Sequence, residues 1–282
     1  MCALKTRWIC IALVGMLVLS ICSCQNSRPD DLEIHFLDVG QGDAILIRTT
    51  DGDILIDAGP DDAQETLCLR LEALGVKSLA LAVFTHSDED HIGGGDGVLR
   101  RFPAETVWIS DCFEQNEATR QLLYAADATR SEVVCVEAGR QFALGDAVLT
   151  VFAPIGDCSD INANDASIVL KLVYGDVSAM LMGDAETALE QRLLASYDPV
   201  HFQCDLLKVA HHGASTSSGM AFLQAARPQY AVIGCAAGNY YGHPHGEVLA
   251  RLEAVGAEVF RTDLSGDIVF VSDGRSLQYR EQ

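Results

Sequence analysis

The chain has 282 residues, of which 49% are hydrophobic and 21% are charged. That composition is typical of a globular protein, and the length is enough for one large domain with a sizeable core. The 40 Asp and Glu residues outnumber 19 Lys and Arg, which gives a formal charge of −21. Such an acidic chain lacks the basic surface that neutralises phosphates, so no stable nucleic-acid partner is expected.

The first 24 residues are typical of a secretory signal. A basic start leads into an apolar run at residues 8–19, shorter than the about 20 residues of a transmembrane helix. The run ends in Ile21-Cys22-Ser23-Cys24, which resembles a bacterial lipobox, and Cys24 fits best because the small Ser23 precedes it. We therefore expect an exported lipoprotein at the extracellular face of the cell membrane, with residues 25–31 as a tether. An uncleaved membrane anchor is the alternative.

Strands and helices alternate in the first half of the remaining chain. Strands are predicted at 33–39, 44–48, 54–57, 79–84, 106–109 and 133–137, and helices at 63–74, through 98–101, and at 114–128. The segment 79–84 is continuously apolar, as expected of a strand that is buried on both faces.

The second half has the same style. Strands are predicted at 148–153, 167–173, 178–182, 206–209, 230–234, 258–261 and 267–271, and helices at 186–195, 220–226 and 247–255. Both halves place polar residues directly after strands. The pattern predicts one α/β domain, residues 32–282, in which two packed sheets are flanked by helices.

Six cysteines follow Cys24, and none of them forms a C-x-x-C pair. A zinc–thiolate site is therefore not indicated. Cys135 and Cys204 lie in apolar runs and are expected to be small core residues. Export permits disulfides, but the spacing does not reveal the pairing.

The strongest chemical signal is His86-Ser87-Asp88-Glu89-Asp90-His91, followed by three glycines. Four possible metal ligands are crowded directly after a buried strand. Imidazole and carboxylate groups suit zinc, manganese or iron, and the glycines allow the backbone to turn closely behind the ligands. The alternative, an acidic surface loop with incidental histidines, does not explain this placement.

This H-x-D-x-D-H-x-G-G pattern resembles the H-x-H-x-D-H motif of the metallo-β-lactamase superfamily, with Asp88 in place of the second histidine. Four further motifs resemble the extracellular hydrolase domain of ComEC-type competence proteins: L-D-V-G-Q-G-D (37–43), L-I-D-A-G (55–59), A-H-H-G (210–213) and Y-G-H-P (241–244). The resemblance runs from about residue 32 to 275. It implies an αββα sandwich of two mixed sheets flanked by helices, and it is far less specific for the substrate.

The resemblance also implies a site for two divalent cations, with Zn²⁺ expected and Mn²⁺ as the alternative. His86 and Asp88 would hold the first ion, Asp90 and His91 the second, and Asp184 would bridge the two. Asp57 would support the ligand loop without binding metal, unless it is only a turn residue. For Asp184, the alternative is an N-cap of the helix that follows it.

His211 and His212 match the last ligand of the superfamily, and only one of them need bind metal. We favour His212 as the ligand, with His211 facing the substrate. The third superfamily histidine has no counterpart, because Asn164-Asp165-Ala166-Ser167 occupies its place. Asn is a poor ligand and Asp165 a possible one, so the first ion is expected to be held more weakly.

Other polar residues near these motifs have two interpretations. His243 is expected either to contact a substrate oxygen or act as a general acid, or to be a simple turn histidine. The hydroxyls of 215–218 could cradle a phosphate at a helix start or cap that helix. His35 and His201 are expected to be structural.

The chemistry implied by the resemblance is hydrolysis by a metal-bound hydroxide, with Asp90 orienting the water. We consider three functions: an extracellular phosphodiesterase or nuclease acting on single-stranded nucleic acid, a surface esterase for phosphorylcholine-like small phosphoesters, and a non-catalytic binding lipoprotein. Asp88 and the missing third histidine argue against β-lactam cleavage.

Overall fold

The computed structural model describes residues 31–156 and 161–281. The predicted signal and lipobox, all of the tether except Asp31, and Cys158 lie outside the described residues. Within the two described stretches, no helix is both long and apolar enough to cross a membrane.

Two mixed β-sheets form the centre of the molecule. The eight-stranded sheet has the order β15-β14-β1-β2-β3-β4-β5-β6 and the seven-stranded sheet has the order β13-β12-β11-β10-β9-β8-β7. The strands of the first sheet are β1 (Leu32–Phe36), β2 (Ile45–Arg48), β3 (Asp53–Ile56), β4 (Leu79–Val83), β5 (Ala104–Ser110), β6 (Glu132–Val136), β14 (Ile268–Ser272) and β15 (Leu277–Arg280). Those of the second are β7 (Gln141–Leu144), β8 (Ala147–Ala153), β9 (Val169–Tyr174), β10 (Val177–Leu181), β11 (Leu206–Lys208), β12 (Tyr230–Ile233) and β13 (Glu258–Arg261).

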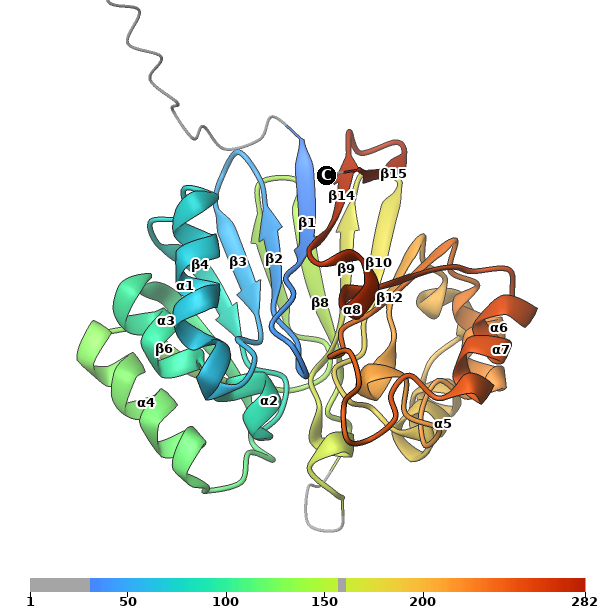
Figure 1. Ribbon diagram of the computed structural model, residues 1–282, viewed down its shortest axis with the longest axis horizontal. Helices are drawn as coiled ribbons and strands as arrows, with labels where there is room; N and C mark the ends of the chain where they lie inside the picture. Colours follow the sequence, from blue (N-terminus) through green and yellow to red (C-terminus); the bar gives the residue numbers. More distant parts are fainter. Residues whose placement is uncertain (1–30, 157–160, 282) are drawn as a thin grey trace, which may run out of the picture.

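Helices cover the outer face of each sheet (Figure 1). The first sheet carries α1 (Gln64–Ala73), α3 (Gly95–Arg101) and α4 (Glu117–Thr129), and the second carries α5 (Thr187–Ser196), α6 (Met220–Ala226) and α7 (Gly246–Ala254). Short turns complete the chain: α2 (Glu89–Ile92), α8 (Thr262–Ser265), η1 (Asp61–Ala63), η2 (Asn164–Ala166), η3 (Pro199–Phe202) and η4 (Ala210–Gly213). The predicted αββα sandwich is confirmed.

Strand β4 shows how the sequence builds these layers. Leu81 and Val83 belong to the apolar cluster between the two sheets, whereas Ala82 and Phe84 belong to the cluster beneath the helices. Successive side chains of a strand point to opposite faces, so a strand covered on both sides must be apolar throughout. A third cluster joins the second sheet to its own helices.

The observed strands differ from the predicted ones at the edges of the sheets. Strands β7 and β15 were not predicted, because each is short, lies at a sheet edge and exposes half of its side chains. Cys135 was predicted to be a core residue and is instead exposed, since β6 is also an edge strand. Cys204 is buried as expected. Cys112 is disulfide-bonded.

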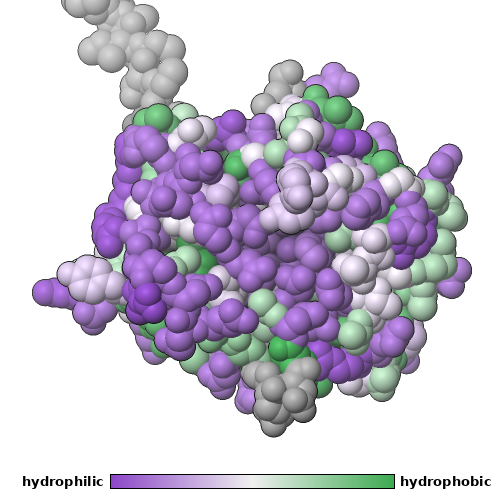
Figure 2. Space-filling model, turned by 60° about the horizontal axis from the view of Figure 1, so that its bottom comes forward, coloured by the Kyte–Doolittle hydropathy of each residue, from purple (hydrophilic) through white to green (hydrophobic). Residues whose placement is uncertain are grey.

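The parallel strands determine where polar residues gather. Strand β3 runs parallel to β4, and β11 runs parallel to both β10 and β12. Their carboxyl ends open on one edge of the sandwich, where α2 and α5 begin (Figure 1). Turning that edge toward the viewer shows hydrophilic residues over the middle of the face (Figure 2). The predicted ligands leave the strands here.

Candidate metal centre

The ligand loop leaves the buried strand β4 and closes into the single turn α2. His86 is fully buried, whereas Asp88 is partly exposed and its Oδ2 lies 3.7 Å from His86 Nε2. Gly94 lets the loop pack tightly, because a Cβ at this position would lie 2.4 Å from the carbonyl oxygen of Ala58. The glycines therefore hold the loop against the end of β3, as its sequence indicated.

Asp57, directly after β3, orients one of the histidines. Its backbone lies in the left-handed region, with φ 58°, and its side chain is 2% exposed. Asp57 Oδ2 lies 2.8 Å from His91 Nδ1, and both Thr85 N and Thr85 Oγ1 donate to the carboxylate at 2.8 Å. Asp57 thus fixes the His91 ring with Nε2 facing the site, and it does so from outside the ligand group.

Asp184 lies at the centre of the site. Its Oδ1 is 3.1 Å from His91 Nε2. Its Oδ2 is 3.5 Å from His212 Nε2, 3.8 Å from His211 Nε2 and 3.9 Å from His86 Nε2. The N-cap of α5 is Glu186, so Asp184 is not the helix cap that the sequence allowed as an alternative. One buried carboxylate therefore faces four imidazoles.

An unusual backbone presents the two adjacent histidines together. In η4, after strand β11, His211 has φ 50° and His212 has φ 52°. The left-handed region costs a non-glycine residue about 1–2 kcal/mol. In an extended continuation of the strand the two side chains would point to opposite faces. Here both face Asp184, and such strain is typical of functional positions.

The arrangement of ring nitrogens fits a bound cation. His212 Nδ1 lies 2.8 Å from the carbonyl oxygen of Gly234, as His91 Nδ1 lies 2.8 Å from Asp57. With both Nδ1–H groups donating to these acceptors, the two Nε2 atoms face each other at 3.3 Å. His86 Nε2 is buried without a hydrogen-bond partner. A metal ion would satisfy these lone pairs.

The charges point the same way. Burial alone would lower the pKa of His91, but the carboxylates of Asp184 and Asp57 hold it well above its ordinary value. Burial would raise the pKa of Asp184, yet His91 and His212 hold it well below its usual range. For Asp90, burial again acts upward, but the hydrogen bond with His212 brings the pKa to about 2. The carboxylates thus favour positive charge at the centre of the cluster.

Two charged residues were not predicted as part of the site. Lys208, the last residue of β11, is 1% exposed and forms an ion pair with buried Asp43. Its Nζ also donates to the carbonyl of Gly183 at 3.3 Å and lies 4.0 Å from Asp184 Oδ1. A lysine in an otherwise apolar strand that leads into two histidines was the available signal.

Asp43 lies behind the histidines. Together with His91, Asp184 and His212, it offers ligand atoms that all lie within 4.8 Å of one another. However, its oxygens lie 3.8 Å from the Nδ1 atoms of His91 and His212, the nitrogens that point away from Asp184. With Lys208 as its partner, we assign Asp43 to the support of the two rings and not to metal binding.

Some sequence-based assignments need correction. Asp165 was considered as a possible ligand, but its Oδ1 accepts a hydrogen bond from the backbone N of Glu186 at 3.0 Å. It therefore serves the start of α5, and the structure does not place it in the ligand group. Ser217 was considered for a phosphate cradle, but its buried hydroxyl lies 3.0 Å from the carbonyl oxygens of both Ala210 and Ala214.

His243 lies beside the histidine pair. Its ring centroid is 5.6 Å from that of His211 and 6.3 Å from that of His212. Asn239 holds its backbone through Oδ1, which accepts from His243 N at 2.9 Å. Burial and the neighbouring histidines lower the pKa of His243 to about 4. The structure thus brings His243, another residue predicted from the sequence, to the rim of the cluster.

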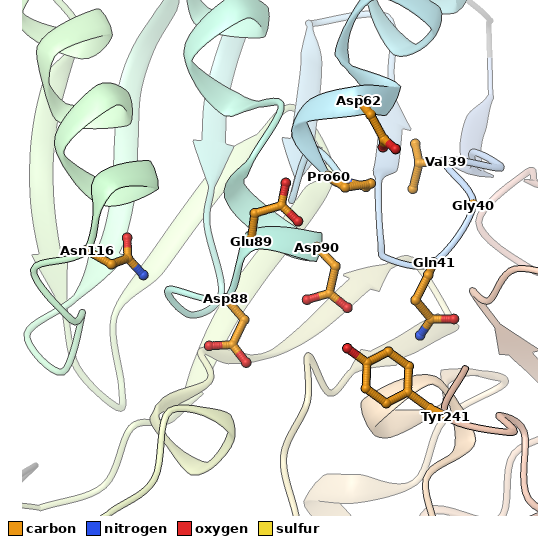
Figure 3. Close-up of a pocket in the computed structure, with 10 residues that line it drawn as sticks. All are labelled: Val39, Gly40, Gln41, Pro60, Asp62, Asp88, Glu89, Asp90, Asn116 and Tyr241. Atoms are coloured by element: carbon orange, nitrogen blue, oxygen red, sulfur yellow. The ribbon is translucent and has the colours of Figure 1, made fainter. Parts of the chain in front are cut away.

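A cleft of about 570 Å³ adjoins the cluster. It is lined by Val39, Gly40, Gln41, Pro60, Asp62, Asp88, Glu89, Asp90, Asn116 and Tyr241. Asp88 and Asp90 lie at the centre of the view, and Tyr241 approaches from the second half of the chain (Figure 3). Among these described lining residues there are four carboxylates and no Lys or Arg.

The chain is similar to several known proteins. The family model of the metallo-beta-lactamase superfamily matches residues 37–112. ComE operon protein 3 of Bacillus subtilis (strain 168) is 30% identical over 278 residues, covering 92% of this chain and 35% of that protein. Competence protein ComA of Neisseria gonorrhoeae is 33% identical over 234 residues, covering 83% of this chain and 31% of that protein.

The crystal structure of the metallo-beta-lactamase fold protein YhfI from Bacillus subtilis has the same fold. It superposes with a TM-score of 0.57 at 13% identity, covering 86% of this chain and 100% of that one. The chain spans about a third of the length of the two competence proteins it matches.

Proposed function

The chain belongs to the metallo-β-lactamase superfamily, and from this premise we propose that it is an exported metal-dependent hydrolase of phosphoesters with a two-metal site. The observation that carries the proposal is the position of Asp184, whose carboxylate faces the Nε2 atoms of four buried or half-buried histidines. A cation bound here would pair with the buried carboxylate and accept the lone pairs of these nitrogens.

The residues divide into two overlapping sets. His86, Asp88 and Asp184 would hold one ion, and Asp90, His91, His212 and Asp184 would hold the other. When bound, two divalent cations make water a nucleophile near neutral pH and stabilise the charge that develops on the substrate. Zinc is the ion favoured by the three imidazoles of these sets, and manganese is the alternative favoured by the carboxylates.

The remaining roles belong to the chain itself. Asp90 lines the cleft and lies 3.2 Å from His212 Nε2, so its carboxylate is placed to orient the attacking water. Asp57 and the carbonyl of Gly234 fix the rings of His91 and His212, which keeps the ligand geometry preorganised. His243, at the rim, would supply a hydrogen bond to a substrate oxygen.

The cleft favours a small substrate over a polynucleotide. Beyond the metal ions, the phosphates of a nucleic acid would approach the carboxylates of Asp62 and Glu89. The described lining residues of the cleft include no Lys or Arg that could neutralise those phosphates. With a formal chain charge of −21, this repulsion would weaken binding further. A single-stranded nucleic acid is therefore the second choice among the substrates.

One observation favours a phosphorylcholine-type ester in particular. Tyr241 is 63% exposed and faces the carboxylates of the cleft (Figure 3). Carboxylates and an aromatic face are the groups that bind alkylammonium cations. A zwitterionic phosphoester would place its phosphate at the metal ions and its cation against this wall.

Metal analysis combined with a substrate panel tests the proposal. The protein reconstituted with zinc or manganese should contain close to two ions per chain. It should hydrolyse bis-p-nitrophenyl phosphate or p-nitrophenyl phosphorylcholine faster than single-stranded DNA, with nitrocefin left intact. A chain that retains no transition metal is not a metallohydrolase, and a metal-loaded chain inert toward every phosphoester would instead be a binding lipoprotein.

We also propose that the protein is exported and carried on the membrane by a lipid at Cys24. The disulfide at Cys112 supports an oxidising compartment. Mass spectrometry of the membrane-associated protein should find an acylated N-terminus at Cys24. An N-terminus at Met1 would support the uncleaved anchor instead.

A further inference from the structure

The first metal set is short of a ligand. The segment that stands in place of the third superfamily histidine forms η2, and its side chains turn toward Glu186. Asp165 accepts from the backbone N of Glu186, Asn162 Nδ2 donates to Glu186 Oε2 at 3.0 Å, and Asn164 Nδ2 donates to Oε1 at 3.4 Å. Only His86, Asp88 and Asp184 remain for this ion.

His211 lies where the missing ligand is needed. Its Nε2 is 3.8 Å from Asp184 Oδ2, the same oxygen that lies 3.9 Å from His86 Nε2. Two ligand atoms that are each about 2.1 Å from one ion lie about 3–4 Å apart over the ordinary range of bond angles. His211 Nε2 and His86 Nε2 therefore each lie at a distance from Asp184 Oδ2 that fits two ligands of a common ion.

We propose that His211 replaces the missing third histidine and binds the first metal ion through Nε2. The inference rests on the proposed two-metal function and adds a ligand to it. The side chain of His211 is 22% exposed, which is less than the exposed fraction of the proposed ligands Asp88 (42%) and Asp90 (29%). The left-handed backbone at both His211 and His212 serves both ions, one histidine for each.

Glu186 is the positioning residue in this arrangement. Its Oε1 lies 3.4 Å from His211 Nδ1, a buried nitrogen without a formed hydrogen bond. A carboxylate behind a metal-binding imidazole holds the Nδ1–H and increases the basicity of the other nitrogen. Asn162 and Asn164 hold Glu186 in turn, so the segment that stands in place of the third histidine supports His211 through Glu186.

Zinc titration of the metal-free protein, with metal content measured by mass spectrometry, tests this assignment. Wild type should bind two ions, and His211→Ala should bind one. The control is His243→Ala, which changes a neighbouring histidine that faces the same pair and should keep both ions. His211→Ala with two tightly bound ions overturns the assignment and leaves His211 to the substrate, while the proposed function stands.

A second variant covers the case in which His211→Ala does not fold. Glu186→Ala removes the positioning carboxylate at a helix start where its side chain makes no cap. It should lower the affinity for one of the two ions about 10–100-fold and leave the affinity for the other unchanged. Unchanged affinity for both ions overturns the assignment. Wild type that binds no zinc would instead refute the two-metal function itself.

Discussion

Asp184→Asn is expected to lower phosphoester hydrolysis at least about 100-fold and to reduce metal content, while the fold survives. The substitution keeps the volume of the side chain and removes the anion that four imidazoles face. Loss of a residue that only supports a metal ligand already costs 10–100-fold, and Asp184 is placed to bridge both ions. Without that charge, two close cations repel each other more strongly.

The matched control is Asp165→Asn. Asp165, in η2 before β9, is also a buried carboxylate, but it contacts the backbone of Glu186 and lies outside the ligand group. Its variant should keep two metal ions and most of the activity. Circular dichroism and metal analysis of both proteins separate loss of the site from loss of the fold. Asp184→Asn with near wild-type activity and unchanged metal content would refute the bridging role.

The sequence was informative wherever a buried strand ends in polar residues. The apolar run 79–84 is typical of a strand covered on both sides, so the side chains that follow it were expected at a strand end. His86 and Asp184 both follow this pattern, and the structure brings them together. Strands β7 and β15 were not predicted because their sequences lack such an apolar run. Each has one partner strand and exposes half of its side chains.

The roles of His211 and His212 could be assigned only from the three-dimensional structure. Adjacent residues in a strand point to opposite faces, and the sequence predicted that only one of the pair need bind metal. The structure breaks that rule with two left-handed residues in succession. Packing around the loop imposes this conformation. The A-H-H-G motif by itself does not predict a left-handed backbone at either histidine.

Asp43 and Lys208 were missed because they come from different sheets. Asp43 follows β1 and Lys208 ends β11, and the two meet only when the sheets pack face to face. Taken alone, each has an ordinary interpretation, Asp43 as a turn residue and Lys208 as the exposed end of a strand. Their pairing is a property of the sandwich and not of either motif.

That pairing leads to a large expected effect on stability. Burial would lower the pKa of Lys208, but the carboxylates of Asp43 and Asp184 raise it above its usual value, so the residue is a buried cation. Lys208→Met should lower the free energy of unfolding of the metal-free protein by about 3–5 kcal/mol, the cost of leaving a buried charge without its partner. Denaturant titration in the presence of a chelator measures it.

A double variant removes the carboxylate of Asp43, which Lys208→Met leaves without a partner. Asp43→Asn combined with Lys208→Met replaces the ion pair by neutral groups of similar size, and it should recover most of the lost stability, because the cost lies in the unpaired anion. Lys171→Met is the control, since Lys171 Nζ donates to the carbonyls of His201 and Gln203 and its loss should cost about 1–2 kcal/mol. If the changes in the free energy of unfolding for the substitutions at 43 and 208 were simply additive, Asp43 and Lys208 would not act as a pair. Another residue would then have to provide the support that we assign to Asp43 behind His91 and His212.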